Sequence, residues 1–184
     1  MRKVERSEIL DYVTYEEQRP QIRASAMKAK DLRRVRLGEN LTFLFENHET
    51  VRYQILEMIR AERIVKEADI QHEIDTYNEL LGENGELGCT LLVEIEDPQE
   101  RAEKLSRWLG LPEKVYVKLD DGTKVFAKVD QRQKDDKKIS SVQFLKFPCD
   151  GKVPVAVGCE YEEYKAEVEL TPEQRKALEE DLIN

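Results

Sequence analysis

The sequence predicts an α+β fold, in which a mainly antiparallel sheet carries helices packed on one face within a single domain. Several strand-like segments are joined by short turns, which favours antiparallel pairing. Amphipathic segments with helix-capping residues alternate irregularly with these strands. A length of 184 residues is enough for one domain with a substantial core, so we expect residues 1–184 to form one α+β domain.

Composition narrows the class of protein. Charged residues make up 38% of the chain, apolar residues 40%, and the net charge is −9. Apolar residues recur in regular patterns, which argues against disorder, and no apolar run is long enough to span a membrane. The first residues lack the apolar core of a secretory signal. We therefore expect a cytoplasmic protein with no membrane association.

The three cysteines, Cys89, Cys149 and Cys159, are too few and too widely spaced for a disulfide framework or a zinc site. Free cysteines are commonly buried, so we expect all three to behave as small core residues in a reducing compartment.

The chain begins with a predicted helical arm over about residues 7–34. A capped turn near Ser7 precedes a helix that starts at Thr14, or as late as Arg19 because Pro20 lies in its first turns. This arm is basic, whereas the last 25 residues are acidic. The two ends of the chain could pack together or remain solvated, or the basic arm could bind an acidic partner. We favour packing or solvation. Nucleic-acid binding is disfavoured by a pI near 5.0.

The middle of the chain predicts a hairpin followed by two helices. Residues 35–37 and 41–45 flank a Gly38 turn, which is typical of a hairpin at a sheet edge. The central helix begins near Asn47 or Thr50 and runs to Ile64, and a third helix covers 68–81.

The second half of the chain is richer in strands. Asp97-Pro98 marks a helix start, and Asp121-Gly122 marks the turn of a hairpin over residues 115–129. Residues 131–138 form a charged loop, and Thr171-Pro172 starts a final helix to Leu182. Further strands are predicted at 89–95, 141–147, 153–157 and 166–170.

The central helix carries an unusual acidic residue. Its apolar stripe consists of Val51, Ile55, Met58, Ile59 and Val65. Glu62 falls in the middle of that stripe, where a carboxylate is costly unless it is paired.

Charged and polar residues on this helix form the candidate binding site, namely Arg52, Gln54, Glu57, Arg60 and Glu62. They could line a ligand or partner groove that offers charge-assisted hydrogen bonds. We favour the alternative that they form an ion-pair lattice that orients the helix against the sheet, or that a kink near Arg60 turns Glu62 outward.

A metal site is the most specific catalytic hypothesis. Asp69 and His72 lie three residues apart on one predicted helix, and Glu46 and His48 lie at the strand-to-helix turn. An enzyme could use these four residues together with Glu57 and Glu62. Helical-bundle metal sites repeat the Glu-x-x-His spacing on two helices, whereas this chain has one loose match. Phosphate-binding glycine loops and nucleophile motifs are also missing, so we expect no cofactor.

Several blocks of the sequence are similar to those of a protein family. The most specific block runs through the central helix from Val51 to Ile64. The others are Lys30-Asp31-Leu32-Arg33-Arg34-Val35, Leu37-Gly38, Leu44-Phe45-Glu46, Asp75-Thr76-Tyr77-Asn78, Thr90-Leu91-Leu92-Val93-Glu94 and Val142-Gln143-Phe144-Leu145-Lys146-Phe147. Over almost its whole length the chain resembles the bacterial family of domains of unknown function numbered thirty-five hundred and one.

That resemblance implies no catalytic residues. The family's genes are often placed near those of rubrerythrin-like diiron proteins and an iron–sulfur oxidoreductase, which implies an accessory role in a redox or oxidative-stress system. We therefore expect a non-catalytic accessory protein that binds a protein partner, for example a redox protein, and leave a homo-oligomer open. The alternative is a metal-dependent or small-ligand enzyme.

Overall fold

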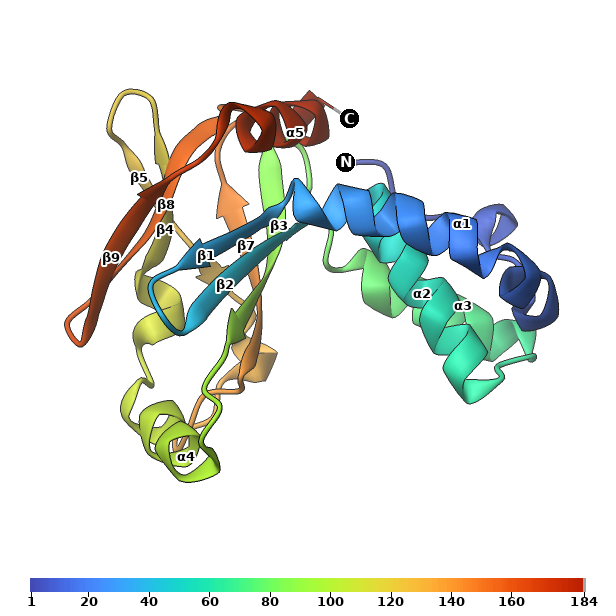
Figure 1. Ribbon diagram of the computed structural model, residues 1–184, viewed down its shortest axis with the longest axis horizontal. Helices are drawn as coiled ribbons and strands as arrows, with labels where there is room; N and C mark the ends of the chain where they lie inside the picture. Colours follow the sequence, from blue (N-terminus) through green and yellow to red (C-terminus); the bar gives the residue numbers. More distant parts are fainter. Residues whose placement is uncertain (184) are drawn as a thin grey trace.

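Two antiparallel sheets and a separate group of three helices make up the protein (Figure 1). The computed structural model describes residues 1–183. The helices are α1 (Tyr12–Asp31), α2 (His48–Glu62), α3 (Glu67–Asn78), α4 (Pro98–Arg107) and α5 (Pro172–Ile183). Short 3-10 turns lie at Arg6–Glu8, Leu111–Lys114 and Gln131–Gln133. The predicted α+β class with antiparallel strands is confirmed.

The strands divide into two sheets. The first has the order β1-β2-β3-β7-β6, with β1 at Arg34–Leu37, β2 at Leu41–Glu46, β3 at Glu86–Val93, β7 at Val142–Pro148 and β6 at Lys128–Val129. The second has the order β5-β4-β8-β9, with β5 at Lys124–Phe126, β4 at Val115–Leu119, β8 at Pro154–Tyr161 and β9 at Tyr164–Glu169. The predicted hairpin around Gly38 lies at a sheet edge, as expected.

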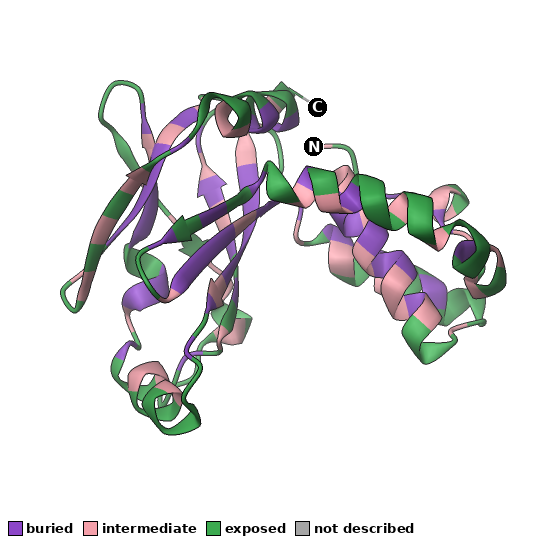
Figure 2. Ribbon diagram, viewed as in Figure 1, coloured by how far each residue is buried: buried purple, intermediate pink, exposed green. Residues whose placement is uncertain are grey.

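The two sheets enclose the larger of two clusters of buried apolar residues (Figure 2). Phe43, Phe45 and Phe147 from the first sheet stack with ring centroids 6.1–6.3 Å apart. Val117 and Val157 from the second sheet belong to the same cluster and are fully buried. Alternate residues of each strand therefore face a shared interior, which is the arrangement that a strand period of two produces.

The second buried cluster lies among α1, α2 and α3, at the other end of the molecule (Figures 1 and 2). Tyr15 from α1, Ile55 and Ile59 from α2 and Ile74 from α3 are almost completely buried there. These helices thus form a lobe with its own apolar interior, which we call the helical lobe.

The first helix starts earlier than the sequence predicts. Asp11 is its N-cap and accepts hydrogen bonds from the backbone N–H groups of Val13 and Thr14. Pro20 lies inside the helix, which continues unbroken to Asp31. Capping by Asp11 fixes the start upstream of Thr14, so a start at Thr14 or Arg19 is wrong.

Glu62 does not face the core, although the helical pattern places it on the apolar stripe; the sequence left its burial open, and the structure shows it turned outward. Helix α2 ends at Glu62, and Arg63 follows in the left-handed region with φ of 50°. Glu62 is exposed, and Val65 is 69% exposed. The helical period places these residues on the stripe, but the helix ends before any neighbour covers that part of it.

The predicted hairpin over residues 115–129 forms in part. β4 pairs with β5 across the Asp121-Gly122 turn, and Gly122 has a φ of 87°. The strand then breaks at Ala127, and β6 pairs with β7 of the first sheet. This segment therefore connects the two sheets. Within residues 1–183, no helix has the length and apolar content required to cross a bilayer.

Candidate functional site

Glu57 is the centre of a polar contact between α1 and α2. The Arg19 guanidinium donates to both carboxylate oxygens, at 2.9 and 2.8 Å, and the hydroxyls of Tyr15 and Tyr53 donate at 2.8 and 3.0 Å. The Arg19 hydrogen bonds, aided by the two tyrosines, lower the pKa of Glu57 to about 2. Glu57 is therefore fully occupied by side chains of this chain.

The other four predicted binding residues do not form a groove with Glu57. Arg60 pairs with Glu16 of α1, and the Arg52 Nε donates to the Glu8 carbonyl at 2.9 Å. Gln54 is half-buried, and Glu62 is exposed at the helix end. These contacts hold α2 against α1 and the N-terminal segment, whereas the ion-pair alternative expected the lattice to orient α2 against the sheet.

The predicted metal ligands lie on separate elements: Glu46 ends β2, His48 begins α2, and the other two lie on α3. Glu46 is buried and accepts hydrogen bonds from the hydroxyls of Thr50 and Thr90, the latter at 2.9 Å, and burial raises its pKa. His48 contacts the Glu8 carboxylate at 2.8 Å.

Asp69 and His72 are exposed on α3. Across residues 1–183, no three His, Cys, Asp or Glu side chains are grouped so that they could hold a metal ion.

Several residues of the basic arm have partners within the chain. Arg33 forms a buried, bidentate ion pair with Asp181 of α5, at 2.7 and 2.8 Å. The Lys30 ammonium lies 5.3 Å from the centre of the Tyr53 ring. The arm and the acidic C-terminal segment are thus in direct contact.

Sequence reasoning missed a cleft between the end of α3 and the outer face of the first sheet. It has a volume of about 690 Å³, within the usual range for small-molecule sites. Apolar and basic side chains contribute much of its lining, including Leu80, Val129, Phe144, Lys3, Lys128 and Lys146. A larger hollow of about 1060 Å³ near α4 is lined largely by charged and polar residues, so it lacks the apolar surface of a typical ligand site.

The cleft depends on a close approach of the backbone at Gly88. A Cβ atom at that position would lie 1.8 Å from the Leu80 carbonyl oxygen, so only glycine allows the segment after α3 to cross β3 there. Lys146 lies opposite Gly88 on the neighbouring strand β7. Its ammonium donates to the carbonyl of Leu81 on the crossing segment, and burial lowers its pKa.

The acidic residues around the cleft are partly neutralised. Arg132 pairs with Glu79 at 2.7 Å and with Asp130 at 2.6 Å. Lys128 lies 3.7 Å from the Glu86 carboxylate. Among the described residues, no carboxylate lies within ion-pair distance of the Lys146 ammonium.

Strand β6 covers the outer edge of β7 at Leu145 and Lys146, and next to it a side chain covers the backbone of Phe144. The Gln133 amide accepts from the Phe144 N–H at 2.8 Å and donates to the Phe144 carbonyl at 3.0 Å. These are the two bonds that a residue of a neighbouring antiparallel strand would make. Val142 and Phe144, on the solvent side of this edge, are 38% and 42% exposed.

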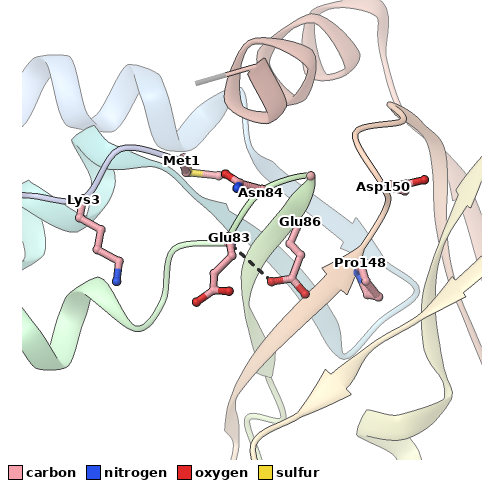
Figure 3. A pocket seen from close by; sticks show the side chains of 9 residues that line it. Met1, Lys3, Glu83, Asn84, Glu86, Pro148 and Asp150 are labelled. Carbon is pink, nitrogen blue, oxygen red and sulfur yellow. Dashed lines mark hydrogen bonds between the residues drawn. The ribbon is translucent and has the colours of Figure 1, made fainter.

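A second hollow of about 540 Å³ shares Lys3 and Glu83 with the cleft. In Figure 3, Lys3 extends from the N-terminal segment on one side, and Glu83 and Glu86 lie on the loop and strand opposite. Pro148 and Asp150 close the far side. The N-terminal segment thus contributes one amine to both hollows.

All three cysteines are buried, as expected. Burial raises the pKa of each thiol, to about 12 for Cys149. A thiol with a raised pKa is a poor nucleophile near neutral pH, so these residues have the features of core residues.

A family model described as "Protein of unknown function (DUF3501)" matches residues 3–182. The chain belongs to this family. The resemblance inferred from the sequence blocks is therefore confirmed. A crystal structure of a novel protein of unknown function from Burkholderia pseudomallei is similar to this DUF3501 chain, with 31% identity and a TM-score of 0.90. The match covers 98% of this chain and 100% of that one. No curated protein matches.

Proposed function

We propose that this DUF3501 protein is a non-catalytic accessory protein that binds a protein partner through the outer edge of β7. The observation that carries the proposal is the Gln133 side chain, which satisfies the backbone N–H and carbonyl of Phe144 at 2.8 and 3.0 Å. An extended segment of a partner could replace this side chain and pair with the part of β7 that precedes Leu145, next to β6.

The surroundings of this edge favour a partner segment of a particular chemistry. Val142 and Phe144 offer exposed apolar surface at alternate positions along the strand. Lys146 and Lys128, which are register partners, follow at the end of the same edge. We therefore infer an extended partner segment with apolar residues facing Val142 and Phe144 and an acidic residue near the two lysines.

A redox protein is the partner class that family membership suggests, through the gene neighbours described above. The buried cysteines with raised thiol pKa values are consistent with a chain that binds such a partner rather than one that exchanges electrons through its thiols.

Site-specific photo-crosslinking in native cells tests the proposal. A photoreactive residue placed at Val142 should capture one partner, whereas the same residue at Val13, which is 57% exposed on α1, should not. Equal capture at both positions would contradict the proposal.

The captured partner then allows a sharper binding measurement. Phe144→Arg should weaken binding of the purified partner, because it removes apolar contact at the edge. Gln133→Ala should strengthen binding a few-fold, because the competing side chain is gone. An unchanged affinity for both variants would exclude β7 as the binding surface.

A further inference from the structure

The cleft between α3 and β7 brings together two lysine amines and an apolar surface. The Lys146 ammonium is half-buried, and among the described residues its hydrogen-bond acceptor is the Leu81 carbonyl. Lys3 extends from the N-terminal segment (Figure 3). It lines this cleft as well as the neighbouring hollow. The charge of Lys3 acts on Lys146 and opposes its protonation. An anion placed between the two amines would relieve that repulsion.

The acidic side chains near these amines do not serve as the anion between Lys146 and Lys3. Glu79 is taken up by Arg132, and Glu86 lies near Lys128. Glu79, Glu83 and Glu86 favour the charged form of Lys146 from a distance, but none lies within ion-pair range of it. Within residues 1–183, the Lys146 ammonium therefore lacks a counter-ion within ion-pair range, and its bond to the Leu81 carbonyl leaves donor capacity for an incoming anion.

The rest of the cleft is suited to an apolar chain. Leu80 from the segment after α3, Val129 from β6 and Phe144 from β7 line it, and Phe144 is 42% exposed. A volume of about 690 Å³ exceeds what a bare anion needs. Small-molecule sites typically combine such an apolar lining with a few polar groups that fix orientation.

We propose that this cleft binds a small carboxylate with an apolar chain, of the class of medium-chain fatty acids. The carboxylate accepts hydrogen bonds from Lys146 and Lys3, and the chain packs against Leu80, Val129 and Phe144. This inference goes beyond the proposed function, because it concerns a small molecule and requires no partner protein.

Titration of the purified full-length protein with octanoate tests the inference, with binding measured by calorimetry and by NMR shifts. Saturable binding is expected, with shifts concentrated at Leu80 and Phe144. Octanol has the same chain without the charge, so it should bind about tenfold more weakly or not at all. Octylamine, with the opposite charge, should not bind. Equal binding of octanol, or no octanoate binding at millimolar concentration, would overturn the proposal.

Two lysine variants locate the carboxylate. Lys146→Met should reduce octanoate affinity by about tenfold or more, because it keeps the aliphatic stem and removes the charge. Lys118→Met is the matched control, because Lys118 is a partly exposed strand lysine on the other sheet. This variant should bind octanoate with the wild-type affinity.

If Lys146→Met unfolds, exposed Lys3 provides a second variant. Lys3→Met should weaken binding several-fold while the thermal midpoint stays unchanged. Unchanged affinity in a folded Lys146→Met or Lys3→Met protein would contradict the proposed carboxylate position.

Discussion

Arg33 and Asp181 form a buried ion pair that joins the end of the first helix to the last helix, across 148 positions of sequence. The two side chains are only 7% and 6% exposed, and Arg33 also donates to the Ala29 carbonyl at 3.0 Å. This pair connects the helical lobe to α5, which packs against the sheets (Figure 1). A basic segment and an acidic segment at opposite ends of the chain thus meet in the fold.

Removing one member of this pair should strongly destabilise the protein. Asp181→Asn leaves the Arg33 charge buried without its counter-ion, so we expect a loss of about 3–5 kcal/mol in the free energy of unfolding. Urea denaturation measures the change. Asp31→Asn is the control, because Asp31 pairs with Arg34 on the surface and should change stability very little. An equal effect of both variants would contradict the structural role assigned to Asp181.

The Glu57 contact should make stability depend on acid pH. Its pKa is lowered from 4.5 to about 2. The carboxylate therefore contributes its full stabilisation above about pH 4.5 and loses it as the pH falls towards 2. Glu57→Gln should cost about 1–2 kcal/mol at pH 7, and the gap to wild type should narrow as the pH falls below about 5.

Denaturation curves at several pH values test this expectation. Glu16→Gln, which removes the exposed pair with Arg60, is the matched control and should show little pH-dependent difference. A gap for Glu57→Gln that stays constant down to pH 2 would show that the carboxylate charge is not the source of the effect.

The Tyr164 hydroxyl should stabilise the contact between the two sheets. It donates to the Leu37 carbonyl and accepts from the backbone N–H groups of Asn40 and Leu41, at 3.0 and 3.3 Å. Tyr164→Phe leaves these backbone groups unsatisfied, so we expect a loss of about 1–3 kcal/mol by thermal or urea denaturation. Tyr161→Phe, in the same hairpin, removes one exposed bond to the Arg107 carbonyl and should cost less.

Metal analysis of untagged protein separates the accessory proposal from the enzyme alternative. The positions of Glu46, His48, Asp69 and His72 lead us to expect less than stoichiometric iron, manganese or zinc after purification. His72→Ala should leave both metal content and stability unchanged, because the imidazole is exposed. Stoichiometric metal that is lost in His72→Ala would establish the enzyme alternative instead.

Thiol reactivity tests whether the cysteines are core residues. Burial raises the pKa values of Cys89, Cys149 and Cys159, so a thiol reagent at pH 8 should react slowly with the native protein. All three thiols should react quickly in denaturant. Rapid reaction of one thiol in the native state would identify an accessible cysteine and reopen a direct redox role.

Much of the secondary structure could be predicted because local signals determine it. The Asn47 cap begins α2 within one turn of the prediction, and Asp97-Pro98 begins α4 as expected. The Gly38 turn forms the predicted hairpin, and the Asp121-Gly122 turn forms the first part of the other. In each case residues within a few positions supply the hydrogen bonds or backbone angles that fix the element.

The candidate site could not be predicted in the same way. The pattern of alternating residues places Phe144 and Lys146 on the same face of a strand, but it does not say what covers that face. The segment at Leu80 crosses β3 at Gly88, which sets the position of the cleft. Periodicity places Glu62 on the apolar stripe of α2 but leaves its burial open, and it is exposed because no neighbour covers the end of the helix.

Local sequence patterns are enough to predict the α+β class, most of the strands and helices, the burial of the cysteines and membership of the family. These features follow from the spacing of apolar residues, from helix caps and from turn residues, which act over a few positions of the chain. The division of the strands into two sheets, the contact of Arg33 with Asp181 and the cleft shared by Lys146 and Lys3 became visible in the folded structure alone. Such contacts join residues far apart in the chain, so they depend on how whole elements pack.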